Sequence, residues 1–201
     1  MTWIVQNLRL IPALPLLAVG ETGAERRQKV AHGVSRGTGM KKPASPGGRK
    51  TMAHTYTNLL THIIFSTKDR KPILEPDLKQ RLFPYLGGIF RELDASPLLI
   101  NGPTDHVHIL AVLPAKLAPA KIIGTVKANS SGWVHKTFPT QRTFAWQVGY
   151  AAFGVSPSLK QTVLDYIAKQ VEHHRKVSFK EELIAFLKKH EIKYDEKYLW
   201  E

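Results

Sequence analysis

The chain has 201 residues, of which 43% are apolar, and this suffices for one ordinary domain or for a smaller domain with a tail. Its 29 Lys and Arg residues exceed its 16 Asp and Glu residues and give a net charge of +13, which is typical of proteins that face polyanions. The absence of cysteine excludes disulfides, thiolate zinc sites and a cysteine nucleophile, and no apolar run approaches the roughly 18 residues of a membrane span.

The first quarter of the chain, residues 1–51, differs in composition from the rest. It holds half of the 14 glycines but only one of the 18 aromatic residues, and its nine basic residues face two acidic ones. With so few core-forming side chains, it is predicted to be a disordered extension or the product of a mis-assigned start, with the domain proper at 52–201. A second interpretation stays open, in which this segment is a disordered basic arm that binds along nucleic acid. Residues 8–19 imitate the apolar core of a signal peptide, but two prolines interrupt them, which disfavours secretion.

The first predicted element after residue 52 is a strand at 55–66, because its residues are β-branched and apolar without helical spacing. Pro76 stands where the first turn of a helix tolerates proline, and apolar residues then recur every three or four positions as far as residue 93, which predicts a helix. Two short strands are predicted at 96–101 and 106–113. The turn-forming residues between them predict a hairpin.

A second helix is predicted over 118–136 and a fourth, aromatic strand over 144–155. Ser156 and Pro157 are predicted to cap and open a helix that runs from residue 158 to about 174, and a last helix covers 179–190. This order predicts an α+β, ferredoxin-like split β-α-β-β-α-β fold, which is an antiparallel sheet with helices on one face and additional C-terminal helices. Many unrelated functions use this fold, so function has to be argued from a site.

Two histidines on the third predicted strand form the first candidate site. Because side chains alternate along a strand, His106 and His108 project from one face about 7 Å apart, while Val107 points to the other face. Two imidazoles can share one cation, although a His-x-His pair is a weak signal by itself. A binuclear zinc hydrolase is disfavoured, since the apolar residues 109–111 follow the pair where that class would add Asp and His.

Tyr166 and Gln170, on the helix predicted after the fourth strand, form the second candidate site. Residues four apart lie on one face of a helix, and such a pair is by itself usually structural. A phenol with an ordinary pKa of about 10 needs help to attack a phosphodiester. A metal ion that binds the scissile phosphate supplies this help by withdrawing charge and fixing an in-line geometry. The tyrosine and the histidine pair therefore suit phosphodiester chemistry together.

Several motifs together resemble the small single-tyrosine HUH transposases of bacterial insertion sequences, the IS200-like family, including the REP-associated kind. The resemblance runs from about residue 54 to residue 200, and the chain departs from the family's Gly-Tyr-Gly-Ala-Phe-Ser pattern at Ala151 and Gly154, which are not chemistry positions. The motifs that carry it are Asp105 with His106-Val107-His108, residues 144–147, residues 149–156, Tyr166-Ile167 with Gln170, Glu172-His173-His174-Arg175-Lys176, residues 192–195 and residues 198–200.

The resemblance implies a metal-dependent transposase that cleaves and rejoins single-stranded DNA at DNA hairpins through a 5′-phosphotyrosine intermediate. It implies His106, His108 and Gln170 as metal ligands, Tyr166 as the nucleophile, and Mg²⁺ or Mn²⁺ as the metal. No nucleotide cofactor is expected, because the phosphotyrosine link keeps the energy of the broken phosphodiester. The family works as a homodimer in which the tyrosine helix of one subunit completes the histidine pair of the other. A cytoplasmic location without membrane contact is expected.

Contacts with the DNA backbone are predicted for basic side chains that a solvated surface would explain equally well. His54 and His62 are interpreted as packing or surface residues, and Trp133, Trp146 and Trp200 as core or interface residues. Two alternatives stay open, a non-catalytic nucleic-acid-binding module on the same fold and a domesticated transposase that only binds hairpins. The predicted DNA-contacting residues are His174, Arg175, Lys176, Lys68, Arg70 and Lys127.

Overall fold

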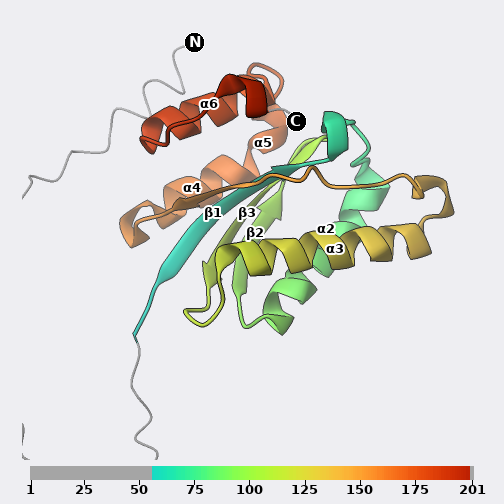
Figure 1. The fold of residues 1–201 in the computed structure, drawn as a ribbon, viewed down its shortest axis with the longest axis horizontal. Helices are drawn as coiled ribbons and strands as arrows, with labels where there is room; N and C mark the ends of the chain where they lie inside the picture. Colours follow the sequence, from blue (N-terminus) through green and yellow to red (C-terminus); the bar gives the residue numbers. More distant parts are fainter. Residues whose placement is uncertain (1–55, 200–201) are drawn as a thin grey trace, which may run out of the picture. The chain divides into compact units, whose positions relative to one another are not determined.

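The structure is a computed structural model, and it describes residues 56–199. The predictions for residues 1–51, and those for His54 and Trp200, lie outside the described residues. In the described part of the chain, four strands form one antiparallel sheet with the order β2-β3-β1-β4, as the split β-α-β-β-α-β prediction requires (Figure 1). The strands are β1 (Leu59–Ser66), β2 (Ser96–Asn101), β3 (His106–Leu113) and β4 (Ala151–Gly154).

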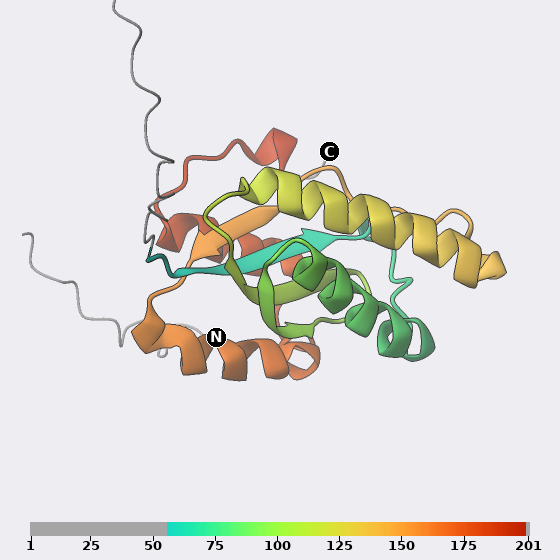
Figure 2. The same ribbon diagram turned by 90° about the horizontal axis from the view of Figure 1, so that it is seen from below.

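Helices cover both faces of this sheet (Figure 1). α2 and α3 lie side by side on one face, and α4, α5 and α6 lie over the other (Figure 2). The fold class is therefore the predicted one, with the additional C-terminal helices on the face opposite the first pair. The helices are α2 (Pro76–Glu92), α3 (Pro119–Thr137), α4 (Lys160–Ala168), α5 (Gln170–His173) and α6 (Phe179–Lys189), with short 3₁₀ turns at Lys68–Arg70, Pro139–Gln141, Pro157–Leu159 and Glu196–Tyr198.

Strand alternation divides the interior into two parts. On β1, Ile63 and Phe65 point into the core beneath α2 and α3, whereas His62 and Ile64 point toward α4–α6. β3 follows the same rule, with Val107 on the α2/α3 side. The larger core is almost entirely apolar, with the buried Ser130 Oγ accepting a hydrogen bond from the Trp146 indole at 2.8 Å, while the face beneath α4–α6 mixes apolar side chains with buried histidines. One face of the sheet thus stabilises the fold, and the other contains polar groups that need partners.

The predicted strand at 144–155 is much shorter in the structure, because only residues 151–154 of this segment, which form β4, pair with β1. Residues 144–150 make one isolated bridge, between Thr67 and Trp146. The reason lies in α3, where the Lys127 Nζ donates hydrogen bonds to the carbonyls of Gln147 at 2.8 Å, Val148 at 3.2 Å and Gly149. The lysine thus holds the carbonyls of residues 147–149 away from a regular strand ladder, and the strand prediction was wrong for residues 144–150.

The predicted helix at 158–174 is divided into two. α4 ends at Ala168, Lys169 has φ −96° and ψ 11°, and α5 starts at Gln170. The amide of Asn101 on β2 donates hydrogen bonds to the carbonyls of Ile167 at 2.8 Å and Ala168 at 3.1 Å. A side chain from the sheet therefore satisfies the carbonyl end of α4 and fixes it to β2. The predicted serine cap is also wrong, since a 3₁₀ turn precedes α4 without a side-chain capping bond.

The predicted helix at 179–190 is confirmed as α6, and it begins with a capping box. Ser178 Oγ accepts a hydrogen bond from the Glu181 N–H at 3.3 Å, and the Glu181 carboxylate accepts one from the Ser178 N–H at 2.9 Å. This reciprocal pair fixes the first turn of the helix. Phe179 and Glu182 are consequently both on the buried side of α6.

Candidate active site

The histidine pair of β3 lies on the sheet face that α4–α6 cover. His106 and His108 are both 0% exposed, and their ring centroids are 5.0 Å apart. The register of the sheet places Ser66 opposite His106 and Ile64 opposite His108 on β1. The predicted shared orientation of the two imidazoles is therefore present in the structure.

Each of the two imidazoles is held by a hydrogen bond at its Nδ1 atom. His106 Nδ1 lies 2.7 Å from Asp105 Oδ1, and because a carboxylate only accepts, His106 donates there. His108 Nδ1 lies 3.0 Å from Nε2 of the buried His62 on β1. Burial is the largest of the effects that lower the pKa of His106 to about 4, so this ring is neutral at pH 7. Its Nε2 atom, which faces the site, then has a lone pair that can accept a proton or bind a cation.

Tyr166 and Gln170 reach the same place from α4 and the start of α5. The Tyr166 ring centroid is 6.1 Å from that of His108. The Tyr166 hydroxyl donates a hydrogen bond to Glu182 Oε1, and the Gln170 amide donates to the same oxygen at 3.0 Å. Burial, followed by the charge of Glu182, raises the pKa of Tyr166, so the phenol is protonated at neutral pH. The structure thus brings together all four residues that the sequence analysis singled out for chemistry.

Glu182 is at the centre of this cluster, and the sequence analysis missed it. Its side chain is 3% exposed, and its Oε2 lies 3.3 Å from His108 Nε2, 3.2 Å from His174 Nε2 and 3.8 Å from His106 Nε2. Burial alone would raise the pKa of Glu182, but the surrounding imidazoles, His108 first, hold that pKa well below its ordinary value. A signal was present in the sequence, because Glu182 falls at helical spacing between Phe179 and Phe186, within an apolar stripe.

His174 also belongs to the cluster and not to an exposed helix end. Its Nε2 lies 2.9 Å from His106 Nε2, and its Nδ1 donates to the carbonyl of Val177 at 2.9 Å. Burial is the largest single influence and would lower the pKa of His174, but the adjacent Glu182 carboxylate, the Val177 carbonyl and the charge of Asp105 together outweigh it and raise that pKa.

The chemistry of these donors fits a divalent metal ion. One ligand atom from each of His106, His108, His174 and Glu182 lies within 4.8 Å of the other three. Among the described residues, the buried atoms without a hydrogen-bond partner include His108 Nε2, Gln170 Oε1 and Glu182 Oε2. Buried polar atoms are nearly always satisfied, and a cation held by His108 Nε2 and Glu182 Oε2, which lie 3.3 Å apart, would satisfy these two.

The residues predicted to contact DNA are dispersed. Arg175 and Lys176 are exposed just after α5, and Lys68 is exposed at the 3₁₀ turn after β1. The Lys127 ammonium binds backbone carbonyls, and burial lowers the pKa of Lys127 to about 8. His174, as described above, faces the cluster of His106, His108 and Glu182. The DNA contacts of all six residues stay predictions.

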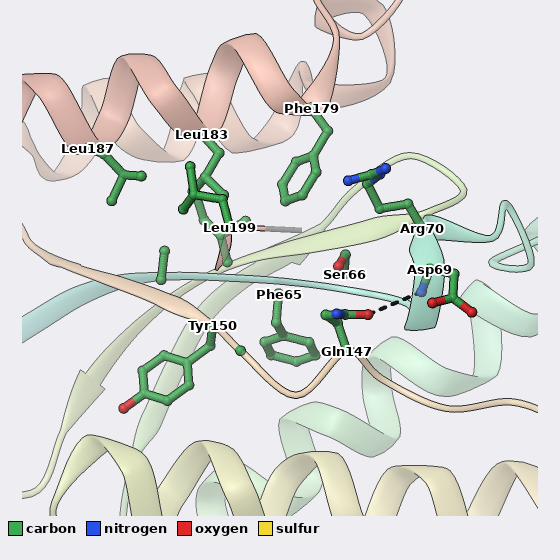
Figure 3. Close-up of a pocket in the computed structure, with 13 residues that line it drawn as sticks. Phe65, Ser66, Asp69, Arg70, Gln147, Tyr150, Phe179, Leu183, Leu187 and Leu199 are labelled. Atoms are coloured by element: carbon green, nitrogen blue, oxygen red, sulfur yellow. Dashed lines mark hydrogen bonds between the residues drawn. The ribbon is translucent and has the colours of Figure 1, made fainter. Parts of the chain in front are cut away.

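A pocket of about 230 Å³ adjoins the cluster, between α6 and the edge of the sheet (Figure 3). Phe179 connects the two, because it lines the pocket and its ring stacks on that of His106 with centroids 4.2 Å apart. Arg70 and Asp69 line one end of the pocket with φ values of 53° and 56°, and the Asp69 N–H donates to Gln147 Oε1 at 3.1 Å (Figure 3). Left-handed non-glycine residues are uncommon and are concentrated at functional sites.

Comparisons with known proteins place the chain among transposases. The profile of a family described as "Transposase IS200 like" matches residues 55–170. Two curated relatives, each named "Transposase for insertion sequence element IS200", come from Salmonella typhimurium strain LT2 and from Salmonella typhi. Each is 27% identical over 139 residues, which represent 64% of this chain and 88% of the relative.

Two solved structures are similar to this chain. A candidate transposase from Deinococcus radiodurans R1 superposes with a TM-score of 0.50 and 21% identity, over 61% of this chain and 98% of that chain. A REP-associated tyrosine transposase bound to a REP hairpin gives a TM-score of 0.47 and 15% identity, over 64% of this chain and 76% of that chain. The first likeness shows a shared fold. No helix within residues 56–199 is long and apolar enough to cross a membrane.

Proposed function

The chain belongs to the IS200-like transposase family, whose profile covers more than half of its length, and from this we propose that it cleaves and rejoins single-stranded DNA with Tyr166 as the nucleophile. Membership of a transposase family implies DNA cleavage and strand transfer. The observation that supports a tyrosine mechanism is the position of the half-buried Tyr166 and the buried Gln170 beside the buried histidine pair, His106 and His108.

The proposed reaction is a direct exchange of phosphodiesters. The Tyr166 oxygen attacks the scissile phosphorus, the new O–P bond forms as the bond from phosphorus to the 3′ oxygen breaks, and the phenolic proton is released. The departing 3′ oxygen takes up a proton, and the 5′ phosphate remains on the tyrosine. A 3′ hydroxyl from another strand then attacks this link and restores the phenol. No nucleotide cofactor is required, because each step replaces one phosphate ester by another.

His106, His108 and Gln170 are the residues proposed to hold Mg²⁺ or Mn²⁺. The neutral Nε2 of His106 and the unpartnered Gln170 Oε1 are suitable ligand atoms, and their softness relative to an all-oxygen site suits Mn²⁺ in particular. When bound, the cation supplies charge withdrawal at the phosphate. Asp105 and His62 hold the two imidazoles in orientation.

The proposed substrate is single-stranded DNA that carries a hairpin. The family resemblance supports this part, and the net charge of +13 suits a polyanion. We further propose a homodimer in which residues 160–190 of one subunit meet the histidine pair of the other, and the support for this is the resemblance alone. Within the described chain the same contacts are made internally.

A covalent-trapping experiment tests the proposed function. The full chain is incubated with Mn²⁺ and labelled single-stranded hairpin DNAs, taken from the sequence that flanks its gene, and then denatured. A labelled protein–DNA adduct that maps to Tyr166 is expected. Binding of the hairpins without cleavage or adduct, at any metal concentration tested, would instead identify a hairpin-binding module without catalysis.

A further inference from the structure

We infer that the metal site extends beyond the family-matched segment and includes Glu182 of α6 and His174, which join His106 and His108 around one divalent cation. The inference rests on the proposed function in taking this cation to be the one that serves Tyr166. The family profile ends at residue 170, so it assigns no role to either residue. The C-terminal helices would then be part of the active centre.

The distances between the four ligand atoms support this set. Atoms that bind one divalent ion at about 2.1 Å from it lie about 3.0–3.5 Å from one another. Glu182 Oε2 lies 3.3 Å from His108 Nε2 and 3.2 Å from His174 Nε2. His106 Nε2 lies 2.9 Å from His174 Nε2 and 3.8 Å from Glu182 Oε2. Three of these four distances lie in or near this range, and no two of the four atoms are more than 4.8 Å apart.

The hydrogen bonds behind the rings show which atoms face the centre as lone pairs. His106 donates from Nδ1 to Asp105, and His174 donates from Nδ1 to the carbonyl of Val177. In their neutral forms both rings therefore have a lone pair on Nε2, and these two atoms face each other at 2.9 Å. Two lone pairs at this distance repel unless a proton or a cation lies between them.

His108 completes the same pattern. When its Nδ1 donates to His62 across their 3.0 Å contact, the His108 Nε2 lone pair also faces inward, toward an oxygen of Glu182. That Nε2 and that Oε2 are both buried without a hydrogen-bond partner among the described residues. Three imidazole lone pairs and one carboxylate oxygen converge, which is the donor set of a divalent metal site.

The two oxygens of Glu182 have different partners, and this connects the metal to the nucleophile. Oε1 accepts hydrogen bonds from the Tyr166 hydroxyl and the Gln170 amide, while Oε2 faces the three imidazoles. A carboxylate held in this way fixes the distance between the phenol and a bound cation. A buried carboxylate is costly unless it is paired or coordinates a metal, so its position requires such a role.

The test is a direct measurement of Mn²⁺ binding by the full chain, without DNA. Metal-free wild type, Glu182→Gln, His174→Asn and Glu181→Gln are titrated with Mn²⁺ by calorimetry, and circular dichroism confirms that each is folded. Glu181→Gln is the matched control, because Glu181 is the exposed neighbour on the same helix and glutamine can also serve in the capping box. Glu182→Gln and His174→Asn should each weaken Mn²⁺ binding about tenfold or more. Glu181→Gln should change it less than about twofold.

Unchanged Mn²⁺ affinity in a folded Glu182→Gln protein would overturn the inference and leave Glu182 as a structural partner of Tyr166. If Glu182→Gln does not fold, His174→Asn decides the question by the same criterion. The measurement is independent of the proposed reaction. A wild type that binds Mn²⁺ through Glu182 but forms no tyrosine adduct would refute the proposed function and leave the metal site standing.

Discussion

Asp105 Oδ1 accepts a hydrogen bond from His106 Nδ1 at 2.7 Å, although the two residues are adjacent in the chain. Asp105 lies just before β3 and His106 is its first residue, so the carboxylate turns back onto the ring that follows it. This bond fixes the tautomer of His106 and directs its Nε2 toward the centre of the cluster.

Asp105→Asn should therefore weaken Mn²⁺ binding about tenfold, because a neutral amide makes the imidazole a poorer ligand than a carboxylate does. Calorimetric titration of the metal-free protein measures the effect. Asp94→Asn is the control, since Asp94 is an exposed residue paired with Lys116. Equal affinities for the two variants would show that Asp105 does not act through the metal.

Removal of the proposed nucleophile or of a proposed metal ligand should abolish strand cleavage but not hairpin binding. Tyr166→Phe and His108→Ala should each eliminate strand cleavage, because the first removes the attacking oxygen and the second a proposed metal ligand. Hairpin affinity should stay within a few-fold of wild type, since basic residues elsewhere are predicted to hold the DNA. Gel shifts and cleavage assays on the same samples measure both. A covalent adduct in Tyr166→Phe would refute the assignment of the nucleophile.

Mixing two inactive variants tests whether subunits share their sites. In the shared arrangement, a mixed dimer of His108→Ala and Tyr166→Phe has one site with both defects and one site with neither, so cleavage should return. Gln170→Ala should be rescued by His108→Ala but not by Tyr166→Phe, because Gln170 and Tyr166 are on one continuous segment. Tagged co-purification confirms that the subunits have exchanged. If cleavage is still absent, the active site is completed within one chain, as it is in the contacts of the described residues.

Lys127→Met should destabilise the protein by about 2 kcal/mol, because carbonyls of residues 147–149 lose a charged donor. Urea denaturation measures this loss. Lys121→Met on the same helix is the matched control, since Lys121 is exposed, and it should stay within about 0.5 kcal/mol of wild type. Hairpin affinity of the folded Lys127→Met protein tests the predicted DNA contact separately. A stability equal to that of Lys121→Met would contradict the structural role of Lys127.

A chain that begins at Met52 should fold and cleave as well as the full chain, because residues 1–51 lack core-forming side chains and precede the family match. Thermal melting and cleavage rate are the measurements. A loss of DNA affinity that is large at low salt and disappears at high salt would support the basic-arm alternative. Instability or inactivity would show that the segment is a required part of the protein.

Local pattern was sufficient to predict most of the fold and half of the site. β2 and β3 occur at the predicted residues, and strand alternation alone placed His106 and His108 on one face. The features that were missed depend on partners distant in sequence. Lys127 shortens β4, and Asn101 ends α4. No periodicity within the shortened strand or the divided helix could indicate those bonds.

Glu182 was missed for a related reason. Its position in the first turn of a helix is where exposed acidic residues are common, and its neighbour Glu181 does serve the helix end. Only the sheet, which brings His108 and its neighbours under α6, gives the second carboxylate a different role. The tyrosine and glutamine were found because a known motif contains them, and the carboxylate that binds both lies beyond that motif.

The capping box of Ser178 determines which side chains of α6 face the sheet, because it fixes the residue at which the helix begins. Each residue added to or removed from the start of a helix turns every later side chain by about 100° around the axis. If the helix began one residue later, Glu182 would rotate away from the imidazoles, and a neighbouring side chain would take its place against the sheet. Ser178 therefore fixes the residue at which α6 begins and, with it, the direction of the Glu182 side chain. Ser178→Ala would leave that direction less well fixed, although Ser178 makes no contact with the Glu182 carboxylate itself.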